Sequence, residues 1–173
     1  NVSPSFLQLS KPTDKLIVIN SASKSFNMTG WRIGWITHPE ELGSHIAKLV
    51  QITTTGVPEF LQNGLMSALQ NYKLLTREVR INLKKSRDIM FQRLVEWKRV
   101  ECSVPEAAFY AFFKVKDIKD SLEFAKKLII DTNVGVAPGI AFGESGEGHL
   151  RICFAAQQSF INEIMDRLEP ALN

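Results

Sequence analysis

The hydrophobic pattern of the first half of the chain alternates short apolar runs with amphipathic segments. The run at 16–19 is partly β-branched and is typical of a strand buried on both faces in a parallel sheet. A polar loop separates it from a second predicted strand at 31–36. Two helices should follow, each opened by a proline suited to the first turn, from Pro39 to about Thr53 and from Pro58 onward.

A long amphipathic helix dominates the middle of the sequence. The helical region after Pro58 should bend near Asn71–Tyr72, and one face then repeats at spacings of three and four residues. That face is apolar except for one serine. Its positions are Val79, Leu83, Ser86, Met90, Leu94 and Trp97. A helix of this length is suited to connecting two domains.

After Trp97 the pattern changes to a mixture of short strands and helices. Asp120 with Glu123 three residues later has the layout of a capping box, which predicts a helix over 121–131. The glycine-rich stretch 139–148 should be a loop. Strands are expected at 100–104, 108–115, 134–138 and 149–155. One face of a terminal helix is formed by Ile161, Ile164, Met165, Leu168 and Leu172.

The order of these elements predicts an α/β protein that is part of a larger fold. Residues 1–75 are expected to be the remainder of a large domain, 76–98 an interdomain helix, and 99–173 a small α+β domain. The first part is too small for a domain, and its strands need parallel neighbours. Because the chain also starts at Asn1 rather than Met, we expect a fragment that lacks sheet on its N-terminal side.

Composition narrows the class of protein. The 173 residues are 45% apolar and 23% charged, as in ordinary globular proteins. The net charge of +3 is weak and dispersed, which gives nucleic-acid binding little support. No apolar run is long enough to predict a membrane span, and no Cys/His spacing predicts a metal site. Cys102 and Cys153 lie in apolar stretches, so we expect two buried thiols and a cytoplasmic protein.

The stretch from Ser21 to Trp35 carries the clearest chemical signal. Lys24 lies in a loop of small residues directly after a predicted strand, where open α/β sheets bind ligands. Ser21, Ser23 and Arg32 add hydroxyls and a guanidinium, which suit a phosphate. Chemistry alone also allows a solvent-exposed lysine beside a polar loop.

The order of residues in this stretch, S-x-S-K-x-F-x-M-T-G-x-R-x-G-W, resembles the lysine segment of class I/II aminotransferases. These are fold-type I enzymes that depend on pyridoxal 5′-phosphate. The resemblance implies that Lys24 forms the Schiff base with the cofactor and that Ser21 and Arg32 bind its phosphate, with Ser23 as a further candidate. It also implies the C-terminal portion of that fold, the end of a large parallel-sheet domain plus a small α+β domain.

A second segment is similar to the same family. Residues 138–152 follow its P-G-x-x-F-G…G-x-x-x-R-[IL] run, in which the arginine holds the α-carboxylate of the substrate. The resemblance therefore implies that Arg151 binds substrate, and a planar guanidinium suits a bidentate carboxylate. Taken alone, an arginine within a strand is more often a structural ion-pair partner.

The resemblance covers 16–172 and implies transfer of an amino group between an L-amino acid and a 2-oxo acid. It also implies a homodimer for the full protein. Two alternatives remain: a C–S lyase or cyclopropane-carboxylate synthase of the same fold, and a non-catalytic module. In the family, the Asp that pairs with the cofactor's pyridine nitrogen lies further upstream of the lysine than Lys24 allows here. Residues 1–173 alone are therefore expected to be nearly or wholly inactive.

Overall fold

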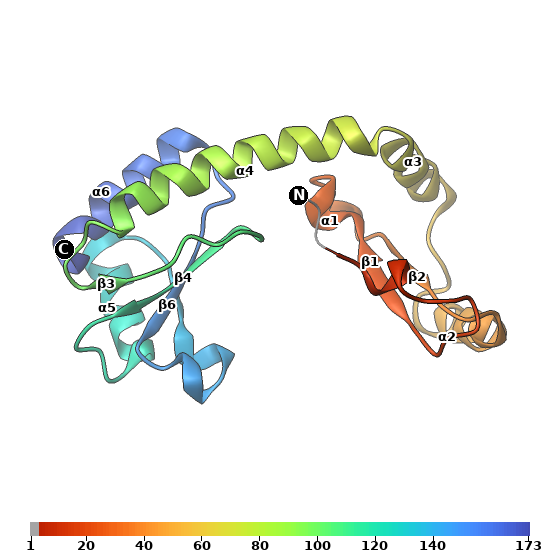
Figure 1. The fold of residues 1–173 in the computed structure, drawn as a ribbon, viewed down its shortest axis with the longest axis horizontal. Helices are drawn as coiled ribbons and strands as arrows, with labels where there is room; N and C mark the ends of the chain where they lie inside the picture. Colours follow the sequence, from red (N-terminus) through yellow and green to blue (C-terminus); the bar gives the residue numbers. More distant parts are fainter. Residues whose placement is uncertain (1–3) are drawn as a thin grey trace. The chain divides into compact units, whose positions relative to one another are not determined.

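The computed structural model describes residues 4–173, which form two compact units divided between Arg80 and Ile81 (Figure 1). Helix α4 (Tyr72–Leu94) contributes residues to both units. The other elements of the first unit are η1 (Phe6–Gln8), β1 (Val18–Ser21), α1 (Ala22–Ser25), η2 (Thr29–Trp31), β2 (Gly34–Thr37), η3 (Glu40–Leu42), α2 (Gly43–Thr54) and α3 (Glu59–Gln70). The predicted domains 1–75, 76–98 and 99–173 stay a prediction.

Strands β1 and β2 form a two-stranded antiparallel sheet, paired from Val18↔Thr37 to Ser21↔Gly34. The prediction of a strand at 16–19 buried on both faces of a parallel sheet is therefore wrong for this structure. Ile17 and Ile19 are 52% and 77% exposed. An apolar run indicates an affinity for a core, but the chain connection sets the partner. Here the chain returns directly beside β1, which gives antiparallel pairing, whereas a parallel pair needs a longer crossover.

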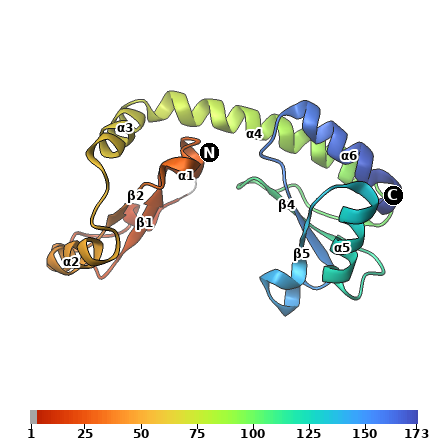
Figure 2. The ribbon, with the colours of Figure 1, turned by 180° about the vertical axis from the view of Figure 1, so that it is seen from behind.

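The second unit is built on a four-stranded antiparallel sheet with strand order β3-β4-β6-β5. Helices α4, α5 and α6 belong to the same unit as this sheet (Figures 1 and 2). Their apolar side chains pack with those of one face of the sheet in a single core. Its elements besides α4 are β3 (Val100–Glu101), β4 (Tyr110–Val115), α5 (Ser121–Thr132), β5 (Ala137–Pro138), η4 (Gly139–Phe142), η5 (Glu144–Gly146), β6 (His149–Cys153) and α6 (Gln158–Leu172).

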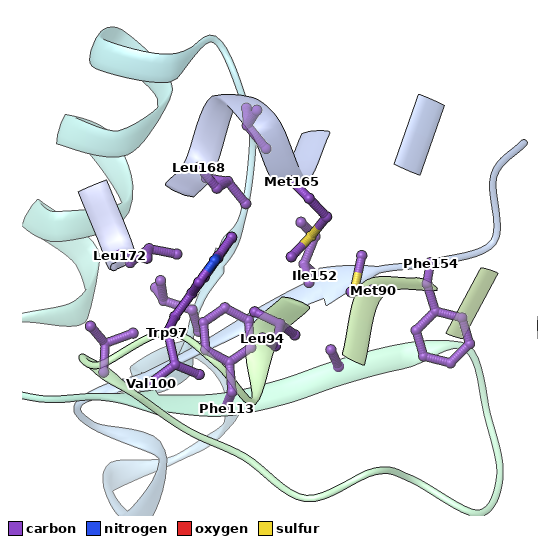
Figure 3. Packing of buried hydrophobic residues seen from close by; sticks show 14 of the residues in the cluster. Met90, Leu94, Trp97, Val100, Phe113, Ile152, Phe154, Met165, Leu168 and Leu172 are labelled. Carbon is purple, nitrogen blue, oxygen red and sulfur yellow. The ribbon is translucent and has the colours of Figure 1, made fainter. Parts of the chain in front are cut away.

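The core of the second unit follows the predicted helical faces. Met90, Leu94 and Trp97 pack with Phe113 of β4 and Leu168 of α6 (Figure 3). Ser86, the single polar residue on this face of α4, is buried, and its hydroxyl donates a hydrogen bond of 2.9 Å to the Ala156 carbonyl. The buried polar group is therefore satisfied. Val79 and Leu83 are only half-buried, so the apolar face is used fully only in the second half of α4.

Helix boundaries largely confirm the sequence prediction. Helix α3 ends at Gln70 and α4 starts at Tyr72, where the bend was expected. Asp120 caps α5 by accepting hydrogen bonds from the backbone N–H groups of Leu122 and Glu123. In a full capping box the Glu123 carboxylate would accept a hydrogen bond from the Asp120 backbone N–H. Here it pairs with Lys126 instead, at 2.6 Å. None of the helices in residues 4–173 is both long and apolar enough to span a membrane.

Side chains alternate strictly across the sheet of the second unit. Ala111, Phe113, Leu150 and Ile152 face the helices and are buried. The opposite face carries Tyr110, Phe112, Lys114, His149, Arg151 and Cys153. The prediction of two buried thiols is wrong for Cys153, which this alternation leaves exposed at the end of β6. Cys102 is half-buried, and its burial raises the pKa of the thiol.

We expect Leu94→Ala to lower the free energy of unfolding by about 3 kcal/mol, because it removes a fully buried side chain and leaves a cavity. The neighbouring change Val95→Ala is the control, since Val95 is 58% exposed and its loss should alter stability by about 0.5 kcal/mol or less. Urea unfolding followed by circular dichroism measures both. Equal effects of the two changes would contradict the packing described here.

Candidate active site

Ser21, Ser23 and Lys24 lie at the junction where β1 ends and α1 begins. Ser21 has an extended backbone (φ −133°, ψ 138°) and caps the short helix, its hydroxyl accepting a hydrogen bond of 3.2 Å from the Ser23 backbone N–H. The Ser21 hydroxyl also donates to the Ser23 hydroxyl at 3.0 Å. Ala22 is fully buried, whereas Lys24 is exposed in the same helical turn. Two hydroxyls and a primary amine thus lie within four consecutive residues.

The pairing of β1 with β2 brings Arg32 to this junction. Ser21 is paired with Gly34, and the Ala22 N–H donates to the Ile33 carbonyl at 3.1 Å. A Cβ on Gly34 would lie 2.3 Å from the Asn20 carbonyl oxygen, so this close approach requires glycine. The register therefore places Gly34 beside Ser21 and Ile33 beside Ala22, and Arg32 is the next residue along the chain.

Two residues of the loop between these strands have left-handed backbones. Asn27 has φ 54° and Arg32 has φ 51°. Such a conformation is sparsely populated by residues with a Cβ, costs roughly 1–3 kcal/mol, and is concentrated at functional sites. The guanidinium of Arg32 donates to the Thr29 carbonyl at 3.0 Å, which stabilises the turn. Within residues 4–173 no carboxylate pairs with Arg32.

Helix α3 packs against the loop that carries Lys24 and Arg32. Ala22, Met28 and Ile33 form a buried apolar cluster with Leu65 and Ala68 of α3. The ring of Trp31 lies so close to Gly64 that a Cβ there would be 2.3 Å from it. Sequence reasoning missed these supporting contacts with α3, because a lone glycine in an apolar helix carries no signal of what packs on it. The backbone of the loop is thus anchored while the Lys24 and Arg32 side chains remain exposed.

Arg151 lies on the face of the second unit's sheet that points away from the helices. It is half-buried, and its Cζ atom lies 4.2 Å from the ring centre of Tyr110 and 4.3 Å from that of Phe142. No carboxylate in the described part of the chain pairs with it. The alternative expectation, a structural ion pair, is therefore not what residues 4–173 contain. Its N–H donors are left for another partner.

Two sets of contacts hold the loop 139–148, which carries Phe142. Gly139 and Gly146 are in backbone contact, since a Cβ on Gly139 would lie 1.9 Å from the Gly146 carbonyl oxygen. The Glu147 carboxylate accepts hydrogen bonds from the backbone N–H groups of Ser121, at 2.6 Å, and Gly148, at 2.8 Å. The bond from Gly148, followed by those from Ser121, holds the pKa of Glu147 below its ordinary value.

The predicted site residues fall into two groups. Ser21, Ser23, Lys24 and Arg32 lie on one continuous segment of the first unit, whereas Arg151 lies on the sheet of the second. A surface pocket of about 400 Å³, lined by Gln157, Ser159, Phe160 and Glu163, contains none of them. Its only ionisable group is one carboxylate, so we assign it no role. The described residues contain no cluster of three or more His, Cys, Asp or Glu side chains suited to a metal ion.

Comparison with known proteins gives the chain a family. The sequence pattern of the family described as aminotransferase class I and II matches residues 3–168. A probable N-acetyl-LL-diaminopimelate aminotransferase from Bacillus subtilis is 36% identical over 160 residues, which are 90% of this chain and 40% of that protein. An aromatic-amino-acid aminotransferase from Thermococcus litoralis is 33% identical over 162 residues, 92% of this chain and 41% of that protein.

Solved structures agree with these sequence matches. The aspartate aminotransferase from Thermotoga maritima has a TM-score of 0.84 at 30% identity, over 97% of this chain and 43% of that one. An aromatic aminotransferase from Pyrococcus horikoshii has a TM-score of 0.83 at 31% identity, over 90% and 42%. The predicted fold class, an α/β portion of this enzyme fold, is thereby confirmed. The chain spans about two fifths of the length of the relatives it matches.

We expect Glu147→Gln to remove part of the pH dependence of stability. Because the pKa of Glu147 is lower in the folded chain than its ordinary value near 4.5, its stabilising contribution is present above about pH 4.5 and is lost as the pH falls through the folded pKa. The variant should be less stable than the parent at pH 7, and the difference should shrink as the pH falls below about 4.5, as measured by urea unfolding across this range.

Glu144→Gln is the matched control for that experiment, because Glu144 is exposed on the same loop. If the stability difference between the parent and Glu147→Gln stayed constant down to about pH 3, the proposed contribution of the ionised carboxylate would be refuted.

Proposed function

The chain belongs to the class I and II aminotransferase family, and we propose that residues 21–32 bind the family's cofactor, pyridoxal 5′-phosphate, while Arg151 binds the carboxylate of an amino-acid substrate. In this proposal the complete enzyme transfers an amino group between an L-amino acid and a 2-oxo acid. The observation that carries it is the β1–β2 register, which pairs Ser21 with Gly34 and Ala22 with Ile33. It thereby brings the segment that carries Ser21, Ser23 and Lys24 next to the segment that carries Arg32.

The donor set at this junction fits a phosphate. The hydroxyl oxygens of Ser21 and Ser23 lie 3.0 Å apart, with the Ser21 O–H donated to Ser23. The Ser23 O–H can donate to an anion as it stands, and the Ser21 O–H can do so after rotation about its C–O bond. Arg32 adds a permanent positive charge, and its one hydrogen bond to Thr29 leaves other N–H groups free to donate. Charge-assisted hydrogen bonds from a guanidinium and two hydroxyls are the interactions by which proteins bind phosphate oxygens. We therefore assign phosphate binding to Ser21, Ser23 and Arg32.

Lys24 supplies the nucleophile and the base in the proposed reaction. Its Nζ atom would hold the cofactor covalently and would be free to act as a base once a substrate amine had replaced it. Bound pyridoxal phosphate acts as an electron sink, which makes the proton on the substrate Cα acidic. The released Lys24 amine removes that proton as a general base and later donates it as a general acid. Its exposure on a short, anchored helix gives the side chain room for both roles.

Arg151 orients the substrate. A half-buried guanidinium without a carboxylate partner in residues 4–173 offers parallel N–H groups to an incoming carboxylate. Bidentate binding would fix the amino acid relative to Arg151 and so contribute to catalysis through orientation. Since every amino acid has this carboxylate, Arg151 does not select a side chain. The relatives named above act on N-acetyl-LL-diaminopimelate, aromatic amino acids and aspartate by their names, which favours transamination over lyase or synthase chemistry.

We further propose a cytoplasmic homodimer for the complete protein. Both cysteines are free thiols, which suits a reducing compartment. Exposed apolar side chains on helices α2 and α3, such as Ile52 and Phe60, are of the kind that subunit contacts bury. Because the chain spans two fifths of its relatives, we propose that residues 1–173 alone have little or no transaminase activity.

Borohydride reduction of the chain mixed with pyridoxal phosphate should fix the cofactor on Lys24, identified by peptide mapping. Lys24→Arg keeps the charge but lacks the nucleophile, so the label should disappear. Lys48→Arg, at an exposed position on α2, should leave it unchanged. A label spread evenly over surface lysines, in a chain whose fold is verified by circular dichroism, would count against the assignment.

Arg151→Lys should weaken the binding of 2-oxoglutarate by about tenfold or more, because the ammonium cannot form the bidentate, charge-assisted pair. Nuclear magnetic resonance titration of the chain measures the dissociation constant. Arg167→Lys is the control, since Arg167 forms only a surface ion pair with Glu163 at 2.5 Å. Equal affinities in the parent and in Arg151→Lys would exclude carboxylate recognition by Arg151.

A further inference from the structure

We propose that Tyr110 and Phe142 are positioning residues that hold the guanidinium of Arg151 between two aromatic rings, so that a carboxylate reaches it only along its N–H edge. This inference rests on the proposed role of Arg151 as the carboxylate-binding residue. It adds two residues to the site: Tyr110, which lies outside both sequence motifs, and Phe142, which lies in the motif at 138–152 but was given no role there. It assigns them a task that differs from filling apolar space.

The two rings approach Arg151 from opposite sides of its strand. Tyr110 lies on β4 and Phe142 on η4, which follows β5 directly, and β6 lies between β4 and β5 in the sheet. The Cζ atom of Arg151 lies over both rings, at 4.2 Å and 4.3 Å from their centres. Both distances are well inside the range of about 6 Å in which a cation is attracted to an aromatic face.

This arrangement suits ligand binding better than it suits structural stability alone. A guanidinium that served stability would be expected to pair with a carboxylate, and none of residues 4–173 provides one for Arg151. The rings stabilise the charge without using its N–H donors. Holding the plane of the group in advance reduces the conformational entropy lost when a carboxylate binds.

Phe142 is itself held in place by neighbours on the same face of the sheet. Its ring meets that of Phe112 edge-on, with centres 6.0 Å apart and an angle of 89°. Phe112 in turn stacks on His149 at 5.0 Å, with the rings nearly parallel. Together with the Gly139–Gly146 contact described above, these rings fix the position of Phe142 from the sheet and from the loop. A loosely held phenylalanine could not restrain a guanidinium.

The test measures the restraint directly. In the 173-residue chain, nitrogen exchange spectroscopy gives the rate of rotation about the Nε–Cζ bond of Arg151. We expect Phe142→Leu to raise this rate about fivefold or more, as expected for the loss of one cation–π contact, and Phe142→Tyr to retain the parent rate. Tyr110→Leu and Tyr110→Phe form a second pair with the same expectation. Phe160→Leu, an exposed phenylalanine on α6, is the control for aromatic loss elsewhere.

The same samples are then titrated with 2-oxoglutarate. We expect its dissociation constant to rise about fivefold in the two leucine variants and to stay unchanged in the aromatic ones. Unchanged rotation rates in folded leucine variants, verified by circular dichroism, would overturn the proposal. If the Arg151 resonances of the parent chain did not change on addition of 2-oxoglutarate, the carboxylate-binding role would be contradicted instead. The rotation rates would still decide whether the rings hold the guanidinium.

Discussion

The close contact between Asn20 and Gly34 determines where the proposed cofactor-binding residues lie. Because no side chain fits between these backbones, β1 and β2 pair in a single register up to the point where the chain turns into α1. That register sets the Ser21 hydroxyl beside the segment that carries Arg32, and it starts the helical turn that presents Lys24. A larger residue at position 34 would shift one strand and separate the groups that are proposed to bind one phosphate.

In the second unit, the alternation of side chains across one sheet serves packing and recognition at once. Ala111, Phe113, Leu150 and Ile152 bury one face against helices, so the strands cannot slide or rotate without exposing apolar surface. The residues between them necessarily face the other way. Because the packed face fixes the strands, it also fixes the positions of Arg151 and its aromatic neighbours on the opposite face.

The sequence allowed the helices and the family to be predicted more reliably than the tertiary contacts. The capping of α5 by Asp120 and the buried face of α4 follow from local spacing. The family follows from the dense motifs around Lys24 and Arg151, whose roles stay predictions. The pairing of the apolar segment at 16–19 was predicted wrongly, because the connection of the chain rather than its apolar residues decides which strand lies beside it. The exposure of Cys153 was missed, because apolar neighbours in the sequence do not reveal which face of the sheet a residue points to. The contact of Trp31 with Gly64 is a tertiary contact that no local spacing predicts. Phe142 and Arg151 lie in one sequence motif, but the motif does not say that their side chains touch.

The two groups of site residues solve different physical problems. A phosphate needs several donors that converge on one point, and the proposed site in the first unit draws them from adjacent residues on a turn fixed by backbone contacts. A carboxylate needs a planar pair of donors at a fixed angle, and the proposed site in the second unit draws it from one side chain flanked by two rings. Charge alone would satisfy neither requirement, since a flexible lysine or arginine attracts an anion without orienting it. In both units it is therefore the packing around the polar group, rather than the group itself, that converts attraction into orientation.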